Sequence, residues 1–259
     1  MQDNDLNLLI NAAQQAGEIA KSMHGTKMNK WEKAEGQGPV SAADIAVNSM
    51  LEDQLRNARP QYGWLSEESE DCIDRLQCKS VFIIDPIDGT SSYIKGLDTW
   101  ALSLAVSTKG KITAAVIYLP MHNLLYSACH KTKSKLNGVP IHASNRKKIN
   151  GAFALTNAGS MDSAYWKEQS PPDIIRVYRP SMAYRMALIA EGRFDTMFTI
   201  YPSWEWDIAA GDLILRKAGA KVTNKRGRLL TFNNKYPKLH GVISANPKLH
   251  KALIQQMIY

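Results

Sequence analysis

Hydrophobic residues recur at steps of three and four near the start of the chain and form short continuous runs after residue 80. Apolar side chains from Leu6 to Met23 fall on one face of a predicted helix. Ser41 begins a second predicted helix, with apolar positions up to Leu55. Strands are expected at residues 80–85, in two segments of 100–120 joined by a turn at Lys109–Gly110, and at 124–130.

Helical and strand patterns alternate in the second half of the chain. Helices are expected at 181–192, 207–219 and from Pro247, and strands at 152–156, 194–200, 221–224 and 241–246. The fold class is therefore α/β, with an α+β domain at 1–145 and an α/β domain at 146–259. No long linker separates the domains, so we expect a ligand site between them.

Composition adds that the chain is soluble and globular. Of 259 residues, 44% are hydrophobic and 22% are charged, and no apolar run approaches the length of a membrane span. The first residues are acidic where a signal peptide would be basic, which predicts a cytoplasmic protein without a membrane partner. Cys72, Cys78 and Cys129 lack metal-site spacing and are expected to be free thiols.

The net charge of +8 favours anionic partners. Basic clusters lie at 131–135, 145–148 and 224–228, without interleaved aromatic residues. Taken singly, each cluster is interpreted as a solvated face. A small phosphorylated metabolite is therefore the expected partner, and nucleic acid is kept as a less favoured one.

Carboxylates gather where predicted strands end and predicted helices begin. They are Asp44, Glu67, Glu68, Asp85, Asp88 and Asp207. Hard cations such as Mg²⁺ take oxygen ligands, and the chain has no His/Cys pattern of the kind that zinc or copper takes. The pattern therefore indicates a magnesium site.

Several of these carboxylates also have a purely structural interpretation. Asp44 fits a capping box with Ser41, and Asp207 fits a helix N-cap. Glu67 and Glu68 fit surface charge. Asp85 is harder to explain in this way, because it closes an apolar strand where an unpaired charge would cost several kcal/mol.

A loop of small residues follows Asp88. Its members are Gly89, Thr90, Ser91 and Ser92. Glycine lets a ligand approach the backbone, and successive N–H groups can cradle a phosphate. Carboxylates for Mg²⁺ beside such a loop predict metal-assisted phosphate chemistry.

Three segments resemble the motifs of the inositol monophosphatase superfamily. They are LSEES at 65–69, DPIDGT at 85–90 and WDIAAGDLIL at 206–215. The resemblance implies a layered αβαβα fold of the inositol monophosphatase and fructose-1,6-bisphosphatase type. It also implies a homodimer and a lithium-sensitive, Mg²⁺-dependent phosphomonoesterase without a covalent intermediate.

The resemblance further implies a role for each matching residue, with two or three Mg²⁺ ions. Two ions would be held by Glu67, Asp85, Asp88, Asp207 and the carbonyl of Ile87, and a third by Asp44 through water. The catalytic residues would be Glu67, Asp88 and Thr90, with Glu67 and Thr90 orienting the attacking water. Gly89, Thr90 and Ser91 would bind the phosphate.

Within the superfamily, the chain looks closer to the bacterial 3′(2′),5′-bisphosphate nucleotidases. By residue count, Ile200 stands where inositol phosphatases place a substrate-binding glutamate, and Arg185 matches a basic residue of the nucleotidases. Arg185 is thus expected to bind substrate; the alternative is a solvent-facing helix residue. The predicted reaction removes the 3′-phosphate of adenosine 3′,5′-bisphosphate.

Two alternatives remain open at this point. One is an inositol-1-monophosphatase or a broad sugar phosphatase of the same fold. The other is a regulator that binds RNA or protein and carries a secondary phosphatase site.

Overall fold

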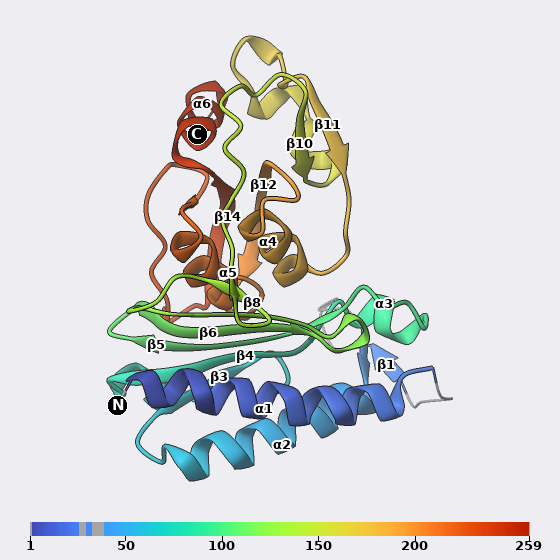
Figure 1. Cartoon of the computed structure of the whole chain (residues 1–259), viewed down its shortest axis with the longest axis vertical. Helices are drawn as coiled ribbons and strands as arrows, with labels where there is room; N and C mark the ends of the chain where they lie inside the picture. Colours follow the sequence, from blue (N-terminus) through green and yellow to red (C-terminus); the bar gives the residue numbers. More distant parts are fainter. Residues whose placement is uncertain (1, 26–29, 33–38, 259) are drawn as a thin grey trace.

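The chain folds into five layers in the order helix pair, sheet, helix pair, sheet, helix (Figure 1). The computed structural model describes residues 2–25, 30–32 and 39–258. The helices are α1 (Gln2–Met23), α2 (Ala42–Ala58), α3 (Thr90–Ile94), α4 (Met182–Ala190), α5 (Glu205–Lys217) and α6 (Pro247–Gln256). This is the mixed α/β layering that the sequence predicts.

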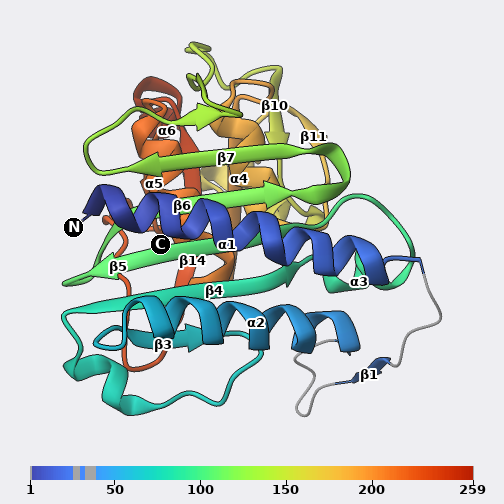
Figure 2. The same ribbon diagram turned by 60° about the horizontal axis from the view of Figure 1, so that its bottom comes forward.

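The first sheet has the strand order β3-β4-β5-β6-β7-β8-β9. Its strands are β3 (Gly63–Ser66), β4 (Ser80–Asp88), β5 (Ala101–Thr108), β6 (Lys111–Leu119), β7 (Leu124–Cys129), β8 (Lys135–Leu136) and β9 (Val139–Pro140). Only β3 and β4 pair in parallel. Helices α1 and α2 cover one face (Figure 2), so Phe82 and Ile84 pack on them while Ile83 faces α4 and α5.

The second sheet has the strand order β11-β10-β12-β14-β13. Its strands are β10 (Ala152–Leu155), β11 (Ile174–Val177), β12 (Thr196–Trp204), β13 (Lys221–Thr223) and β14 (Lys238–Ala245). Strand β10 pairs in parallel with β11 and β12, whereas β14 runs antiparallel to both of its neighbours. Helix α6 packs on one face through Leu249 and Leu253.

Helices α4 and α5 form the central layer and are buried along most of their length. Apolar residues of both sheets join one cluster around these helices, including Ile83 and Leu155 with Met186 and Ile214. The two halves of the chain therefore share a core. Their division at residues 145 and 146 stays a prediction, and the chain crosses between the sheets after Pro140.

The structure adds elements that the hydrophobic pattern did not predict. These are β3, β8, β9, β11, helix α3 and the antiparallel pair β1 (Lys30–Glu32) and β2 (Pro39–Ser41). All are at most five residues long, too short for a periodic pattern to develop. In the part of the chain that the structure describes, no helix combines the length and apolarity that a membrane crossing needs.

Candidate active site

Three carboxylates from distant parts of the chain meet between the first sheet and the central helices. One ligand oxygen from each of Glu67, Asp85 and Asp207 lies within 4.8 Å of the others. Glu67 follows β3, Asp85 lies in β4 and Asp207 is in the first turn of α5. The sequence prediction that these residues gather is therefore matched by their positions.

Backbone hydrogen bonds place the first two carboxylates. The amide of Glu67 donates to the carbonyl of Ile84 at 3.2 Å, which extends the parallel pairing of β3 and β4 beyond Ser66. In β4 the pairing with β5 shifts between Asp85 and Asp88, where three steps along β4 match two along β5. Because Pro86 lies in this bulge and has no N–H to donate, the ladder is interrupted where the carboxylates occur.

One carboxylate oxygen of Asp85, the buried Oδ1, is left without a hydrogen-bond donor among the residues that the structure describes. Burial raises the pKa of Asp85 well above its usual range, and the charges of Glu67 and Asp88 raise it further. Burial also raises the pKa of Asp207, with Asp88 and Glu67 adding to the effect. A cation would relieve all of these costs at once.

Asp88 is held differently, by the start of α4. Its Oδ2 accepts hydrogen bonds from Ser181 Oγ at 2.7 Å and from the Ala183 amide at 2.5 Å. Burial raises the pKa of Asp88, but these two donors and the nearby Arg185 oppose the shift. Ser181 is also the N-cap of α4, so one carboxylate links the first sheet to the central helix layer.

Asp44 caps helix α2, as its sequence context suggested, and it also contacts Thr90, which was not predicted. Its Oδ2 accepts from the Ser41 amide at 2.9 Å, which completes the capping box of α2. Its Oδ1 lies 3.1 Å from Thr90 Oγ1, which is also 3.0 Å from the carbonyl oxygen of Ile87. Asp44 therefore orients the Thr90 hydroxyl, while metal binding by Asp44 and by the Ile87 carbonyl stays a prediction.

The small-residue loop begins at a glycine that the backbone requires. Gly89 has φ +100°, and a Cβ there would lie 3.3 Å from the Thr99 carbonyl oxygen. Gly89 caps α3, so Thr90 and Ser91 lie in the first turn of this short helix, with Thr90 buried and Ser91 exposed. Phosphate binding by the three residues stays a prediction.

Arg185 is buried, so the solvent-facing alternative is wrong. Its Nε and one terminal nitrogen donate to the carbonyls of Ser181 and Pro180, each at 3.2 Å, and its guanidinium lies over the Tyr178 ring. Burial lowers the pKa of Arg185, and the charges of Asp88 and Asp207 oppose that shift. The guanidinium is thus fixed close to the acidic site.

Ile200 does not face this site, and the substrate argument drawn from it is wrong. Its side chain is 5% exposed and packs with Trp166 and Phe198 on the α6 side of the second sheet. A bulge between Thr199 and Pro202 places three steps of β12 against two of β14, so residue counting misjudges which side chain faces the site. By strand alternation it is Thr199 that points toward α4 and α5.

The structural interpretation of Asp207 as the N-cap of α5 is wrong. Helix α5 begins at Glu205 and has Trp204 as its N-cap, so Asp207 is the third helical residue. Its Oδ2 accepts from the Trp204 amide at 3.3 Å. The carboxylate therefore satisfies an orphan N–H of the helix start and still has an oxygen in the cluster.

The residues that support the Glu67 segment were not predicted from the sequence. Asn48 accepts from Ser66 Oγ at 2.6 Å and donates to Ser69 Oγ, which also accepts from Trp64 Nε1. These bonds fix the segment around Glu67 on helix α2. They join residues up to 21 positions apart and follow no local motif.

The comparisons with known proteins place the chain in a family. The model of the inositol monophosphatase family matches residues 1–258, so the chain belongs to the inositol monophosphatase family. The Nus factor SuhB of Escherichia coli K12 is 29% identical over 262 residues, which cover 97% of this chain and 95% of the relative.

Solved structures agree with this assignment. The extragenic suppressor protein suhB from Bartonella henselae has a TM-score of 0.82 at 27% identity and covers 97% of each chain. Staphylococcal inositol monophosphatase-1, in an inhibitory complex soaked with LiCl, has a TM-score of 0.85 at 20% identity and covers 98% of this chain and 94% of that one. At that identity the second likeness shows the fold alone.

Proposed function

We propose that the chain is a metal-dependent phosphomonoesterase with its active site at Glu67, Asp85 and Asp207. The observation that carries the proposal is the buried Asp85 Oδ1, which no described residue satisfies in a cluster of like charges. An all-carboxylate donor set suits Mg²⁺. Membership of the inositol monophosphatase family supports the same chemistry.

Each of the chain's own groups has a definite task in this proposal. Glu67, Asp85, Asp88 and Asp207 would hold the metal, with the Ile87 carbonyl, and Asp44 would bind a further ion through water. Bound Mg²⁺ would supply a Lewis acid and a water of lowered pKa. The Thr90 hydroxyl, fixed by Asp44, would orient that water with Glu67, and the loop from Gly89 to Ser91 would bind the phosphate oxygens.

Arg185 favours a substrate with a second anionic group. Its remaining terminal nitrogen makes no hydrogen bond within the part of the chain that the structure describes, and the charges of Asp88 and Asp207 act on the guanidinium. The N–H groups of this nitrogen can donate charge-assisted hydrogen bonds to a phosphate. We therefore propose adenosine 3′,5′-bisphosphate as the substrate, hydrolysed at its 3′-phosphate.

A phosphate-release assay with Mg²⁺ tests both the phosphatase activity and the choice of substrate. The panel contains adenosine 3′,5′-bisphosphate, inositol 1-phosphate and a sugar bisphosphate. We expect kcat/KM for the nucleotide to exceed that for inositol 1-phosphate by roughly tenfold or more. A preference for inositol 1-phosphate would contradict the nucleotide assignment alone, whereas no release from any substrate would contradict the enzyme.

Two arginine variants, one at Arg185 and one at a control position, show whether Arg185 binds the substrate. Arg185→Ala should raise KM for the nucleotide with a smaller effect on kcat, because it contacts a group that does not react. Arg176→Ala, an exposed residue of β11, is the matched control and should leave KM unchanged. Equal kinetics in the two variants would remove Arg185 from the substrate site.

A second candidate function is a regulator that binds RNA or protein. It is favoured by the net charge of +8 and by the name Nus factor that the E. coli relative carries. Retention on RNA that falls steeply with salt, is unaffected by removal of divalent cations and persists in Asp85→Asn would support it. Absence of retention at low salt would contradict the RNA form of this function.

A further inference from the structure

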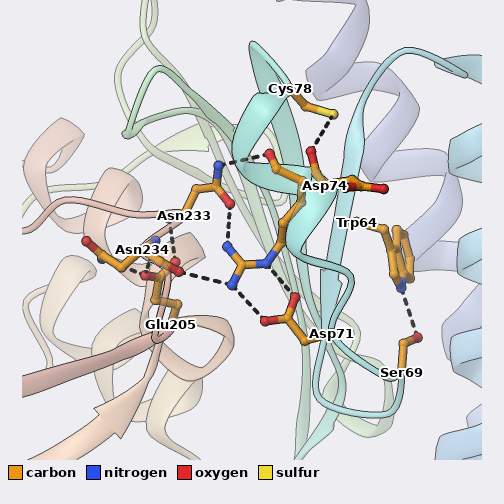
Figure 3. Close-up of polar contacts among 9 residues, drawn as sticks. Trp64, Ser69, Asp71, Asp74, Cys78, Glu205, Asn233 and Asn234 are labelled. Carbon is orange, nitrogen blue, oxygen red and sulfur yellow. Dashed lines mark hydrogen bonds and ion pairs between the residues drawn. The ribbon is translucent and has the colours of Figure 1, made fainter.

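A second buried polar cluster lies beside the carboxylates and is organised around Arg75. The Arg75 side chain is 1% exposed. Its guanidinium donates to Asp71 Oδ1 at 2.6 Å and Asp71 Oδ2 at 2.8 Å, to Asn233 Oδ1 at 2.6 Å and to the Asn234 carbonyl at 3.0 Å (Figure 3). Arg75 thus joins the segment after Glu67 to a loop 158 residues away.

The fit of Arg75 against the first sheet is equally close. A Cβ on Gly63, in β3, would lie 2.9 Å from Arg75 Cβ and 3.1 Å from its Cα. The glycine lets the backbone of Arg75 rest directly on the strand that leads to Glu67. Asn233 Nδ2 also donates to the Arg75 carbonyl at 3.2 Å. Both the backbone and the side chain of Arg75 are therefore fixed.

The loop that Arg75 contacts is itself fastened to the start of α5. Glu205 is fully buried and accepts from the Asn233 amide at 2.6 Å, the Asn234 amide at 2.9 Å and Asn234 Nδ2 at 2.6 Å (Figure 3). Glu205 is the first residue of α5, two positions before Asp207. A continuous set of contacts therefore runs from the Glu67 segment to Asp207 through Arg75.

We propose that Arg75 is a positioning residue that holds Asp207 and Glu67 close together for metal binding. Without a metal these carboxylates repel each other, and a cluster fixed by outside contacts does not have to be assembled by the ion. The inference rests on the proposed function. It adds that residues outside the ligand set determine how tightly the metal binds.

The direction in which metal affinity changes when Arg75 is removed distinguishes a positioning role from an electrostatic effect of its charge. Arg75 is a cation, so its removal should strengthen the binding of another cation if only its charge acted through space. Loss of positioning should instead weaken metal binding. A purely structural role would lower the melting temperature of the metal-free protein without changing metal affinity.

A matched pair of substitutions tests the proposal without removing the buried arginine. Asn233 has φ +62°, a left-handed conformation that glycine adopts freely, so Asn233→Gly keeps the loop while deleting both side-chain contacts to Arg75. Asn137, in the β8–β9 turn, has φ +47° and also makes two side-chain hydrogen bonds, in its case both to backbone groups far from Arg75 in the sequence. Asn137→Gly is therefore the control.

The measurement is calorimetric titration of the metal-free full chain with Mn²⁺. We expect Asn233→Gly and Arg75→Met to bind Mn²⁺ roughly tenfold more weakly than the unchanged protein, and Asn137→Gly to bind like it. In phosphate release, the two test variants should need more Mg²⁺ for half-maximal rate and should recover most of kcat at saturation.

Four outcomes would overturn the proposal. Unchanged affinity in Asn233→Gly, or equal weakening in Asn137→Gly, would show that the contacts to Arg75 do not act on the metal. Tighter binding in Arg75→Met would show a charge effect. If the unchanged protein binds no Mn²⁺, the proposed function fails, and the inference fails with it.

Discussion

The first turn of α5 separates two buried polar clusters that are satisfied to very different degrees. On one side, Glu205 receives three N–H hydrogen bonds and is linked through Asn233 to the cation Arg75. On the other side, Asp207 joins Glu67 and Asp85, and a buried oxygen of Asp85 has no partner among the described residues. The donors of the chain satisfy the first cluster, whereas a cation would be needed to compensate the second.

The difference shows how structural and functional charges can be distinguished. A buried carboxylate that serves the fold is surrounded by donors, because an unsatisfied charge costs several kcal/mol. A carboxylate that serves a ligand is left unsatisfied, and its cost is offset only when the ligand binds. By this criterion we interpret Glu205 as structural and Asp85 as functional. Asp207, which joins Asp85 in its cluster, lies only two positions after Glu205.

The largest effect that follows from this difference is on catalysis. Asp85→Asn or Asp88→Asn removes a metal-binding charge at nearly constant volume and should lower kcat by about 100-fold or more. The rate of phosphate release at saturating Mg²⁺ measures the loss. A variant that kept near-normal activity would contradict the assignment of that aspartate to the metal site.

On the satisfied side the same isosteric change should affect stability. Glu205→Gln places an amide group against backbone N–H donors and should lower the free energy of unfolding by about 1–3 kcal/mol. Urea unfolding of the metal-free protein measures this change. Asp85→Asn is the control, because it should leave the stability of the metal-free protein unchanged or raise it. Equal losses of stability in the two variants would contradict the distinction between a structural Glu205 and a functional Asp85.

Lithium provides a smaller test of the unsatisfied cluster. Li⁺ is close to Mg²⁺ in size but has half the charge, so occupation of the site by Li⁺ should slow turnover at millimolar concentrations. Steady-state phosphate release at fixed Mg²⁺ is compared in LiCl and in NaCl of the same ionic strength. Equal rates in both salts would count against the metal site proposed at Glu67, Asp85 and Asp207.

A remote group should titrate without affecting the site. His250 on α6 donates to or accepts from Thr223 Oγ1 at 2.8 Å. Burial, with a smaller effect from Lys221, lowers the pKa of His250 to about 4 from 6.5. Because the unfolded state then binds more protons in this range, His250 should destabilise the fold as pH falls from 6.5 to 4.

Thermal unfolding between pH 7 and pH 4 measures the contribution of His250. His250→Gln, which cannot take up a proton, should lose less stability across this range than the unchanged protein. Identical pH profiles in the two proteins would show that His250 is not held in its neutral form.

The parts of the site that were predictable lie in contiguous motifs. Asp85 and Asp88 lie at the end of β4 and Gly89 follows it, so one local pattern contains both of these proposed ligands and the proposed phosphate loop. Their supports lie elsewhere in the sequence: Ser181 reaches Asp88 across 93 positions, and Asn233 reaches Arg75 across 158. A single sequence contains no periodic signal for such contacts.

The wrong prediction for Ile200 also has a local cause. Counting seven residues back from Asp207 assumes a regular strand, but the bulge in β12 turns Ile200 away from the site. The α/β class was predictable because the long helices and strands have clear periodicity, and the layering was implied by the family resemblance. Strands β3 and β11, with four residues each, are too short to show a period.

A paired unfolding measurement shows whether the unsatisfied carboxylates form a metal site. The melting temperatures of the unchanged protein and Asp85→Asn are compared with EDTA and with Mg²⁺ at about 100 times its Kd. Binding should then add about 2.7 kcal/mol, or roughly 5–10 °C for a chain of this size, to the unchanged protein only. We expect Asp85→Asn to be equally or more stable than the unchanged protein in EDTA and less stable in Mg²⁺. If Mg²⁺ does not stabilise the unchanged protein, the carboxylates do not form a metal site.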